Sequence, residues 1–234
     1  MHIHKHILSW INDFFFLIYP EQCEACGNSL IKGENILCTN CLIDMPYTDY
    51  PLWDDNPVAQ IFWGRQEIEM ATALFYFNKG SRYRKLLHKL KYKHKPEIGV
   101  FLGRELGVSI KGSEYFAKVE GIVPVPLHSS RIKTRGYNQS ERIAKGLSEV
   151  TGWKIYNNLI LRTKATETQT KKSKEERWKN VSGKFALNNP DIAKGKHLIL
   201  VDDVVTTGAT LEACAAELLK IEELKLYIGV LAKA

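Results

Sequence analysis

The chain has 234 residues and a formal net charge of +7, with 44% hydrophobic and 25% charged residues. This composition is ordinary for a folded globular protein, and it excludes a disordered, collagen-like or low-complexity chain. The length allows one sizeable domain with a small additional module. The positive charge is compatible with an anionic partner but does not require one.

The first 20 residues are the only stretch with the character of a membrane or export signal. The apolar run is short and is interrupted by Asn12 and Asp13, whereas a spanning helix needs about 20 apolar residues. No small-residue cleavage site follows it. We therefore expect an amphipathic helix ending at Pro20, no transmembrane segment and a cytoplasmic protein, with peripheral membrane contact as the alternative.

Four cysteines form two C-x2-C pairs, Cys23 with Cys26 and Cys38 with Cys41, separated by eleven residues. Each pair can direct two thiolates at one point, and two pairs form the closed tetrahedral set typical of structural Zn²⁺. Disulfides or a redox pair are the alternatives, but a reducing compartment favours metal. Because sulfur fills all four positions, this Zn²⁺ is expected to hold the fold and not to catalyse.

The rest of the chain alternates strands with helices. Residues 46–66, rich in Pro, Asp and aromatic residues, predict a linker that packs on the protein. The apolar patterns then predict strands at 71–77, 119–127, 197–201 and 225–232, and helices at 81–92, 96–109, 139–151 and 209–220. This order is typical of an α/β domain with a parallel sheet flanked by helices. We expect residues 1–55 to form the N-terminal helix and zinc module, and residues 56–234 to form the α/β domain.

Residues 79–95 contain eight Lys and Arg residues and no Asp or Glu. Tyr83 and Tyr92 lie within this run, on a predicted helix. The stretch could bind the backbone of single-stranded DNA with aromatic stacking. A solvated helix face and a wall of a diphosphate pocket are the alternatives.

The stretch HLILVDDVVTTGAT carries the strongest chemical signal. Asp202 and Asp203 end a buried strand, where open α/β sheets bind ligands. A turn and the start of a helix follow, and a helix start presents unpaired N–H groups to an anion. A sugar phosphate satisfies both features, with its phosphate in the turn and its hydroxyls on the carboxylates. The turn comprises Thr206, Thr207, Gly208, Ala209 and Thr210.

This stretch resembles the phosphoribosyl pyrophosphate (PRPP) motif of type I phosphoribosyltransferases. The resemblance implies that Asp202 and Asp203 bind the ribose 2′ and 3′ hydroxyls, that residues 206–210 hold the 5′-phosphate, and that Mg²⁺ accompanies PRPP. In 6-oxopurine salvage enzymes an Asp precedes the Thr-Gly of this turn. Thr206 stands there in this chain, which disfavours that substrate class and leaves orotate-type and amido-type chemistry open.

The stretch VPVPLHSSRIKTRGYNQSERIAKGL is similar to the signature of the ComF family. The four-cysteine module and residues 162–185 fit the same family, so the resemblance covers nearly the whole chain. It implies a type I phosphoribosyltransferase fold and a role in competence, that is, DNA uptake for transformation. Arg131, Lys133 and Arg135 suit a pyrophosphate loop, and Arg131 and Arg135 are the candidate catalytic cations. The charged residues 162–184 predict either a closing lid or a solvated loop.

Two functions follow from these observations. One is a ComF-type protein that binds PRPP, a nucleotide or a related 5′-phosphoribosyl ligand and serves competence, with single-stranded DNA and the competence machinery as partners. The other is an active PRPP-dependent transferase of orotate or amido type in nucleotide metabolism. A zinc-ribbon nucleic-acid binder with an incidental α/β domain is a third interpretation. No pattern in the sequence identifies an acceptor base or an oligomeric state.

Overall fold

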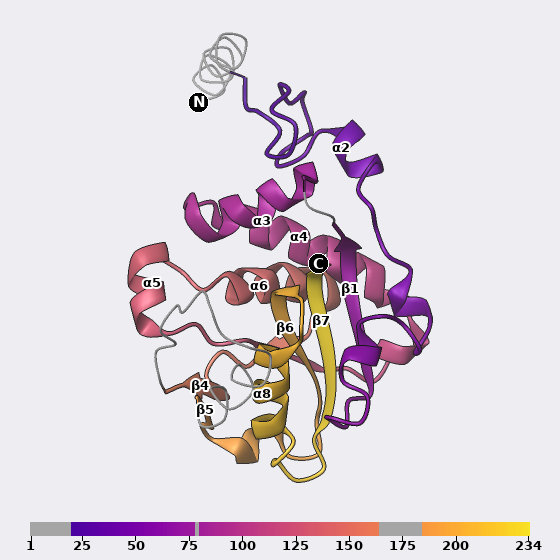
Figure 1. Ribbon diagram of the computed structural model, residues 1–234, viewed down its shortest axis with the longest axis vertical. Helices are drawn as coiled ribbons and strands as arrows, with labels where there is room; N and C mark the ends of the chain where they lie inside the picture. The colour runs from indigo at the N-terminus through magenta and orange to yellow at the C-terminus, as the bar shows by residue number, and fades with distance from the viewer. Residues whose placement is uncertain (1–19, 78–79, 164–183) are drawn as a thin grey trace, which may run out of the picture.

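The computed structural model describes residues 20–77, 80–163 and 184–234 (Figure 1). The predicted N-terminal helix and most of the predicted lid lie outside these residues. Within the described part, no helix combines the length and the apolar character needed to cross a bilayer.

A five-stranded parallel sheet forms the centre of the molecule and confirms the predicted α/β class. In spatial order its strands are β1 (Met70–Tyr76), β7 (Lys225–Lys233), β6 (His197–Val205), β2 (Gly121–Pro124) and β3 (Lys154–Ile155). Because every strand is parallel to its neighbours, all the carboxyl ends meet at one edge of the sheet. Figure 1 shows this edge facing α3.

Helices cover both faces of the sheet. The main ones are α3 (Arg82–Tyr92), α4 (Pro96–Lys111), α6 (Gln139–Thr151) and α8 (Ala209–Leu218). Ile199 and Val201 of β6 join the core under α4 and α6, whereas Leu198 and Leu200 join the core under α8. This burial on both faces explains why the first half of β6 is continuously apolar.

The remaining elements are short. They are α2 (Thr39–Ile43), α5 (Ser129–Arg135), the antiparallel pair β4 (Ile160–Arg162) and β5 (Phe185–Leu187), and the 3-10 turns η1 (Tyr50–Leu52), η2 (Ala59–Ile61), η3 (Glu114–Phe116) and η4 (Pro190–Ala193). The sequence does not predict α5, because Ile132 is its only apolar residue and no helical period exists. The His128 side chain starts the helix by accepting a hydrogen bond from the Ser130 amide at 3.2 Å.

The linker after the cysteine module packs on β1, as predicted. The Thr48 amide donates to the Leu74 carbonyl at 3.0 Å, and the buried Asn56 amide group donates to the Ala71 carbonyl at 2.8 Å. These bonds hold residues 46–66 against the outer strand of the sheet. The cysteine module lies beyond α3 in Figure 1, so α3 separates it from the sheet edge.

Candidate functional site

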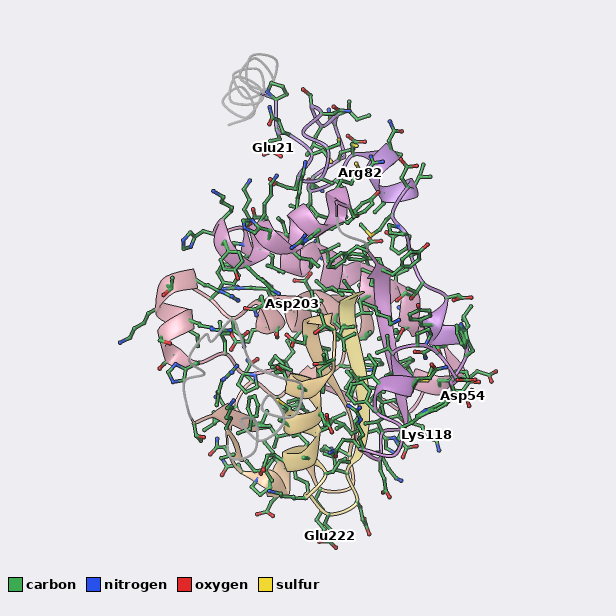
Figure 2. The ribbon with its side chains drawn as sticks, in the orientation of Figure 1. Glu21, Asp54, Arg82, Lys118, Asp203 and Glu222 are labelled. Atoms are coloured by element: carbon green, nitrogen blue, oxygen red, sulfur yellow. The ribbon has the colours of Figure 1, made fainter. Side chains whose placement is uncertain are left out.

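The two predicted carboxylates lie at the carboxyl end of β6, and each is held by a different helix. Asp202 accepts a hydrogen bond through Oδ1 from the Ser140 hydroxyl of α6 at 2.9 Å, and another from the Asp203 amide at 2.9 Å. Asp203 Oδ1 lies 2.9 Å from Lys91 Nζ of α3. Figure 2 shows Asp203 between the end of β6 and α3. Successive strand residues face opposite sides of the sheet, which explains why the two carboxylates have different partners.

Asp203 carries an unsatisfied acceptor. Its side chain is 5% exposed, and Oδ2 has no hydrogen-bond partner among the described residues. Leaving a buried charged acceptor without a partner costs free energy. A buried carboxylate oxygen of this kind is suited to a hydroxyl donor or a cation, which is what the sequence predicts for this position.

Asp202 is unusually easy to protonate. Burial, followed by the neighbouring Asp203 carboxylate, raises the pKa of Asp202 to about 7, although the Asp203 amide, Lys91 and Ser140 oppose the rise. Near neutral pH the protonated and ionised forms of this carboxyl are therefore close in free energy. A cation that binds beside it would favour the ionised form, so the pair is poised to respond to a positively charged ligand.

The turn after β6 has the geometry of an anion-binding site. Gly208 precedes α8 with φ of 78°. The first N–H groups of a helix have no intrahelical partner, and no side chain among the described residues caps those of α8, so they are available to an anion. A Cβ on Gly208 would lie 2.5 Å from Ile61 Cγ2 of η2. Both the backbone conformation and the packing therefore require glycine. The hydroxyl-bearing Thr206, Thr207 and Thr210 are exposed around it, and Ala209 is partly buried.

The predicted pyrophosphate loop is largely the helix α5. Arg131 and Arg135 are four residues apart and so share one face of it. The Arg135 guanidinium donates to Gln139 Oε1 at 2.9 Å and lies 5.1 Å from the centre of the Tyr92 ring. Lys133 is exposed. Arg135 thus lies against Tyr92 of α3, which brings two basic stretches of the sequence together.

Three residues near the carboxylates were not singled out by the sequence. Lys91 and Ser140 contact Asp203 and Asp202 directly. The third residue is Arg162, which interacts electrostatically with Asp202. Burial, and then the nearby Arg131, lower the pKa of the Arg162 guanidinium, whereas Cys214 and Asp202 raise it. A lysine in a basic run and a serine at a helix start carry no individual signal, because only the tertiary fold selects them.

The four cysteines form one cluster. The Sγ atoms of Cys23, Cys26, Cys38 and Cys41 all lie within 4.8 Å of one another, and those of Cys26 and Cys38 are 3.7 Å apart. Burial of Cys23 is outweighed by hydrogen bonds from the backbone at Cys26, Cys38 and Ala25, which lower its thiol pKa to about 6. Burial, by contrast, raises the thiol pKa of Cys38 and Cys41. The convergence of four sulfurs on one point, and not the acidity of one thiol, is what fits a divalent metal ion.

The basic stretch has partners on both sides of α3. Toward the module, Lys89 and Lys95 reach Glu24 at 2.8 and 2.5 Å, and Arg82 reaches Asp44 at 3.4 Å. Toward the sheet, Lys91 pairs with Asp203. Much of the predicted cationic surface is therefore engaged within the protein. Arg84, Lys85 and Lys93 remain exposed and make no ion pair with the described residues.

Comparison with known proteins is consistent with this geometry. Residues 114–233 match the phosphoribosyl transferase domain family. Competence protein F of Haemophilus influenzae is 31% identical over 225 residues, which cover 91% of this chain and 97% of that protein. The chain belongs to the competence protein F (ComF) family and contains a phosphoribosyl transferase domain.

Two further similarities are weaker or cover less of the proteins compared. The DNA utilization protein YhgH of Salmonella typhi is 36% identical over 138 residues, which span 58% of this chain and only 60% of that relative. Among solved structures, adenine phosphoribosyltransferase from Leishmania tarentolae is 12% identical with a TM-score of 0.37, over 77% of this chain and 89% of that one. Similarity at this level carries no information about the substrate.

Proposed function

We propose that this ComF-family protein binds PRPP, or a related 5′-phosphoribosyl ligand, at the carboxyl end of β6. One observation carries the proposal: among the described residues, a buried carboxylate oxygen of Asp203 has no partner, and the helix that starts six residues later has no side-chain cap. The first suits a ribose hydroxyl or Mg²⁺, and the second suits the 5′-phosphate. Asp202 and Asp203 are the ribose ligands in this proposal, and residues 206–210 hold the phosphate.

Mg²⁺ fits the same place. Oxygen atoms are its preferred ligands, and Asp203 Oδ2 is an oxygen that the described residues leave unpaired. When bound, the ion would neutralise charge on a diphosphate. Lys91 would then share Asp203 with the ion or release it, and Arg131 and Arg135 would balance the remaining negative charge.

The test is a thermal shift measurement with PRPP and MgCl₂. We expect PRPP to raise the melting temperature of the wild type, and the double variant Asp202→Asn/Asp203→Asn to abolish the shift. The matched control is Asp54→Asn/Asp55→Asn, an adjacent pair that Figure 2 shows far from β6's carboxyl end, and it should keep the shift. No shift in the wild type at millimolar PRPP, or a full shift in the Asp202/Asp203 variant, would contradict the proposal.

The names of the full-length relatives support a role in competence. In this proposal the chain works in the cytoplasm, where thiols stay reduced, and its zinc module is followed near residue 55 by the phosphoribosyl domain. The exposed Arg84, Lys85 and Lys93 offer a surface for single-stranded DNA. Anisotropy of a labelled oligonucleotide should then fall steeply between 50 and 200 mM salt, and salt-independent binding would contradict a backbone contact.

A second candidate function is active phosphoribosyl transfer. The shared face of Arg131 and Arg135 on α5 favours it, since the leaving pyrophosphate needs cations. In the reaction the bond from ribose C1 to pyrophosphate oxygen breaks and a bond from C1 to an amine or ring nitrogen forms, which then loses a proton. Pyrophosphate release from PRPP should depend on an added base or amine. If no added base or amine stimulates pyrophosphate release, this chain binds the ligand without catalysing transfer.

A further inference from the structure

A cavity of about 700 Å³ adjoins the proposed phosphoribosyl site. It opens between α3 and the carboxyl ends of β1, β6 and β7. Its described lining residues are Phe77, Arg84, Leu87, His88, Lys91, Tyr92, Val204, Thr206 and Ala234. Its volume falls within the range of small-molecule sites, and it touches both the turn that would hold the phosphate and the lysine that pairs with Asp203.

The lining is cationic along one helix face. Arg84, His88 and Lys91 recur at the spacing that places side chains on one side of α3, and none of the described lining side chains is acidic. Lys91 is engaged by Asp203. Arg84 is exposed and makes no ion pair with the described residues, so its guanidinium is available to an anionic group, which it can bind through two hydrogen bonds.

The same cavity offers aromatic and apolar surface. The Tyr92 ring is 59% exposed even though the His88 ring lies 5.0 Å from it and Arg135 lies 5.1 Å from its centre. Phe77, Leu87 and Val204 supply apolar area. An exposed tyrosine beside a guanidinium is suited to stack on a flat anionic ring, because both the ring face and the neighbouring charge contribute.

We propose that this cavity binds a planar ring that carries an anionic group such as a carboxylate. Arg84 would hold the anionic group, Tyr92 the ring face, and the end of the cavity near Lys91 and Thr206 would place the ring beside the ribose site. Arg84 and Lys91 are seven residues apart, or about 10 Å along the helix, which accommodates one such ring. The inference rests on the proposed function, and it assigns a substrate class to it.

Three matched pairs of probes test the proposal: orotate with uracil, nicotinate with nicotinamide, and anthranilate with aniline. Binding is measured calorimetrically on the full chain, with and without Mg²⁺ and ribose 5-phosphate, which has no leaving group. We expect the carboxylated member of at least one pair to bind at least about tenfold more tightly than its neutral partner. Equal binding, or none, across all three pairs would overturn the proposal.

Variants separate the cavity from general charge. Arg84→Gln should bring the carboxylated probe down to the affinity of its neutral partner, and Tyr92→Leu should weaken both by about tenfold. Lys85→Gln removes the same charge from an exposed neighbour that does not line the cavity, and it should leave the affinity for both members of each probe pair unchanged, whatever it does to DNA binding. Equal losses in Arg84→Gln and Lys85→Gln would overturn the proposal.

Failure of this inference and failure of the proposed function give different results. If ribose 5-phosphate or PRPP binds and no carboxylated probe does, only the cavity assignment fails. If the carboxylated probes bind in an Arg84-dependent way and no sugar phosphate binds, the proposed function fails and the cavity stands.

Discussion

Two polar centres lie on opposite sides of α3, and they are built in opposite ways. In the cysteine module four thiols converge on one point, and Glu24, Lys89 and Lys95 tie the loops to α3. At the end of β6 a buried Asp203 oxygen has no partner in the part of the chain that the structure describes, and the pKa of Asp202 is raised to about 7 by burial and then by Asp203. The cysteine cluster is suited to a permanently bound metal ion, and the β6 site is suited to a ligand that binds reversibly.

This difference predicts that mutations in the two centres change the free energy of unfolding in opposite directions. A segment as small as the cysteine module has little core of its own, so removing a thiol should cost stability. Removing the Asp202 carboxylate should relieve burial of charge and repulsion from Asp203, and so should add stability while it weakens ligand binding. Sites that must bind a ligand commonly carry such a cost.

The largest effect is expected from Cys38→Ser. We expect the wild type to hold one Zn²⁺ per chain and the variant to hold none, because a structural zinc site contributes on the order of 10 kcal/mol that only four thiolates provide. Elemental analysis of freshly reduced protein measures the metal. Cys214→Ala is the matched control, since Cys214 is a fully buried residue of α8 outside the cysteine cluster, and the zinc content of this variant should stay at one. A wild type without zinc would contradict the assignment.

Gly208→Ala should have the next largest effect. The substitution puts a Cβ at φ of 78° and within 2.5 Å of Ile61, which we expect to cost about 2–4 kcal/mol of unfolding free energy and to weaken PRPP binding. Gly152→Ala separates the two causes, because Gly152 has φ of 77° and nothing within 4 Å of its added Cβ. It should cost about 1–2 kcal/mol. Equal losses in denaturant titrations would show that the contact with Ile61 is unimportant.

Local sequence patterns predicted the features whose defining residues lie close together in the chain. The apolar run before Asp202 predicted a central parallel strand, and β6 is one, although it continues to Val205 because it pairs with β7 along its whole length. The C-x2-C spacing predicted the cysteine cluster. In both cases the residues that define the feature are neighbours in the chain.

The sequence did not predict what the fold brings together from a distance. Lys91 and Ser140 reach the carboxylates only because α3 crosses the sheet edge and α6 begins beside β6, and neither placement has a local pattern. The helix α5 was missed because its residues lack a hydrophobic period. The role of residues 79–95 was left open between three interpretations, and the ion pairs of Lys89, Lys91 and Lys95 show that α3 joins the module to the site.

Asp202→Asn tests the prediction that removing the Asp202 carboxylate from the β6 site stabilises the protein. In the folded protein the Asp202 carboxyl keeps its proton up to about pH 7, whereas in the unfolded chain it loses the proton near pH 3.8. Ionisation of Asp202 therefore favours the unfolded state, and the wild type loses stability as the pH rises from about 4 to 7. Asparagine cannot ionise and escapes that loss. The variant should therefore be more stable than the wild type at pH 8, by roughly 1–3 kcal/mol, and the difference should shrink toward pH 4.

Denaturant titrations from pH 4 to 8 measure the difference between Asp202→Asn and wild type. Asp203→Asn is the informative control, because it removes the ion pair of Lys91 and should destabilise the protein at neutral pH. If Asp202→Asn were also less stable than wild type at pH 8, the β6 site would resemble the cysteine module in being built for stability, and the contrast between the two centres would be lost.

Glu24→Gln should have the smallest effect and tests how the module is attached. Glu24 accepts from both Lys89 and Lys95, but these lysines are partly exposed, so their pairs should contribute about 1 kcal/mol together. We expect zinc content to be unchanged and amide exchange to increase in the two C-x2-C loops. Glu120→Gln, which removes the exposed pair with Lys196 on the far side of the sheet, should leave that exchange as it is. Faster exchange at the end of β6 as well would mean that α3 transmits the state of the module to the site.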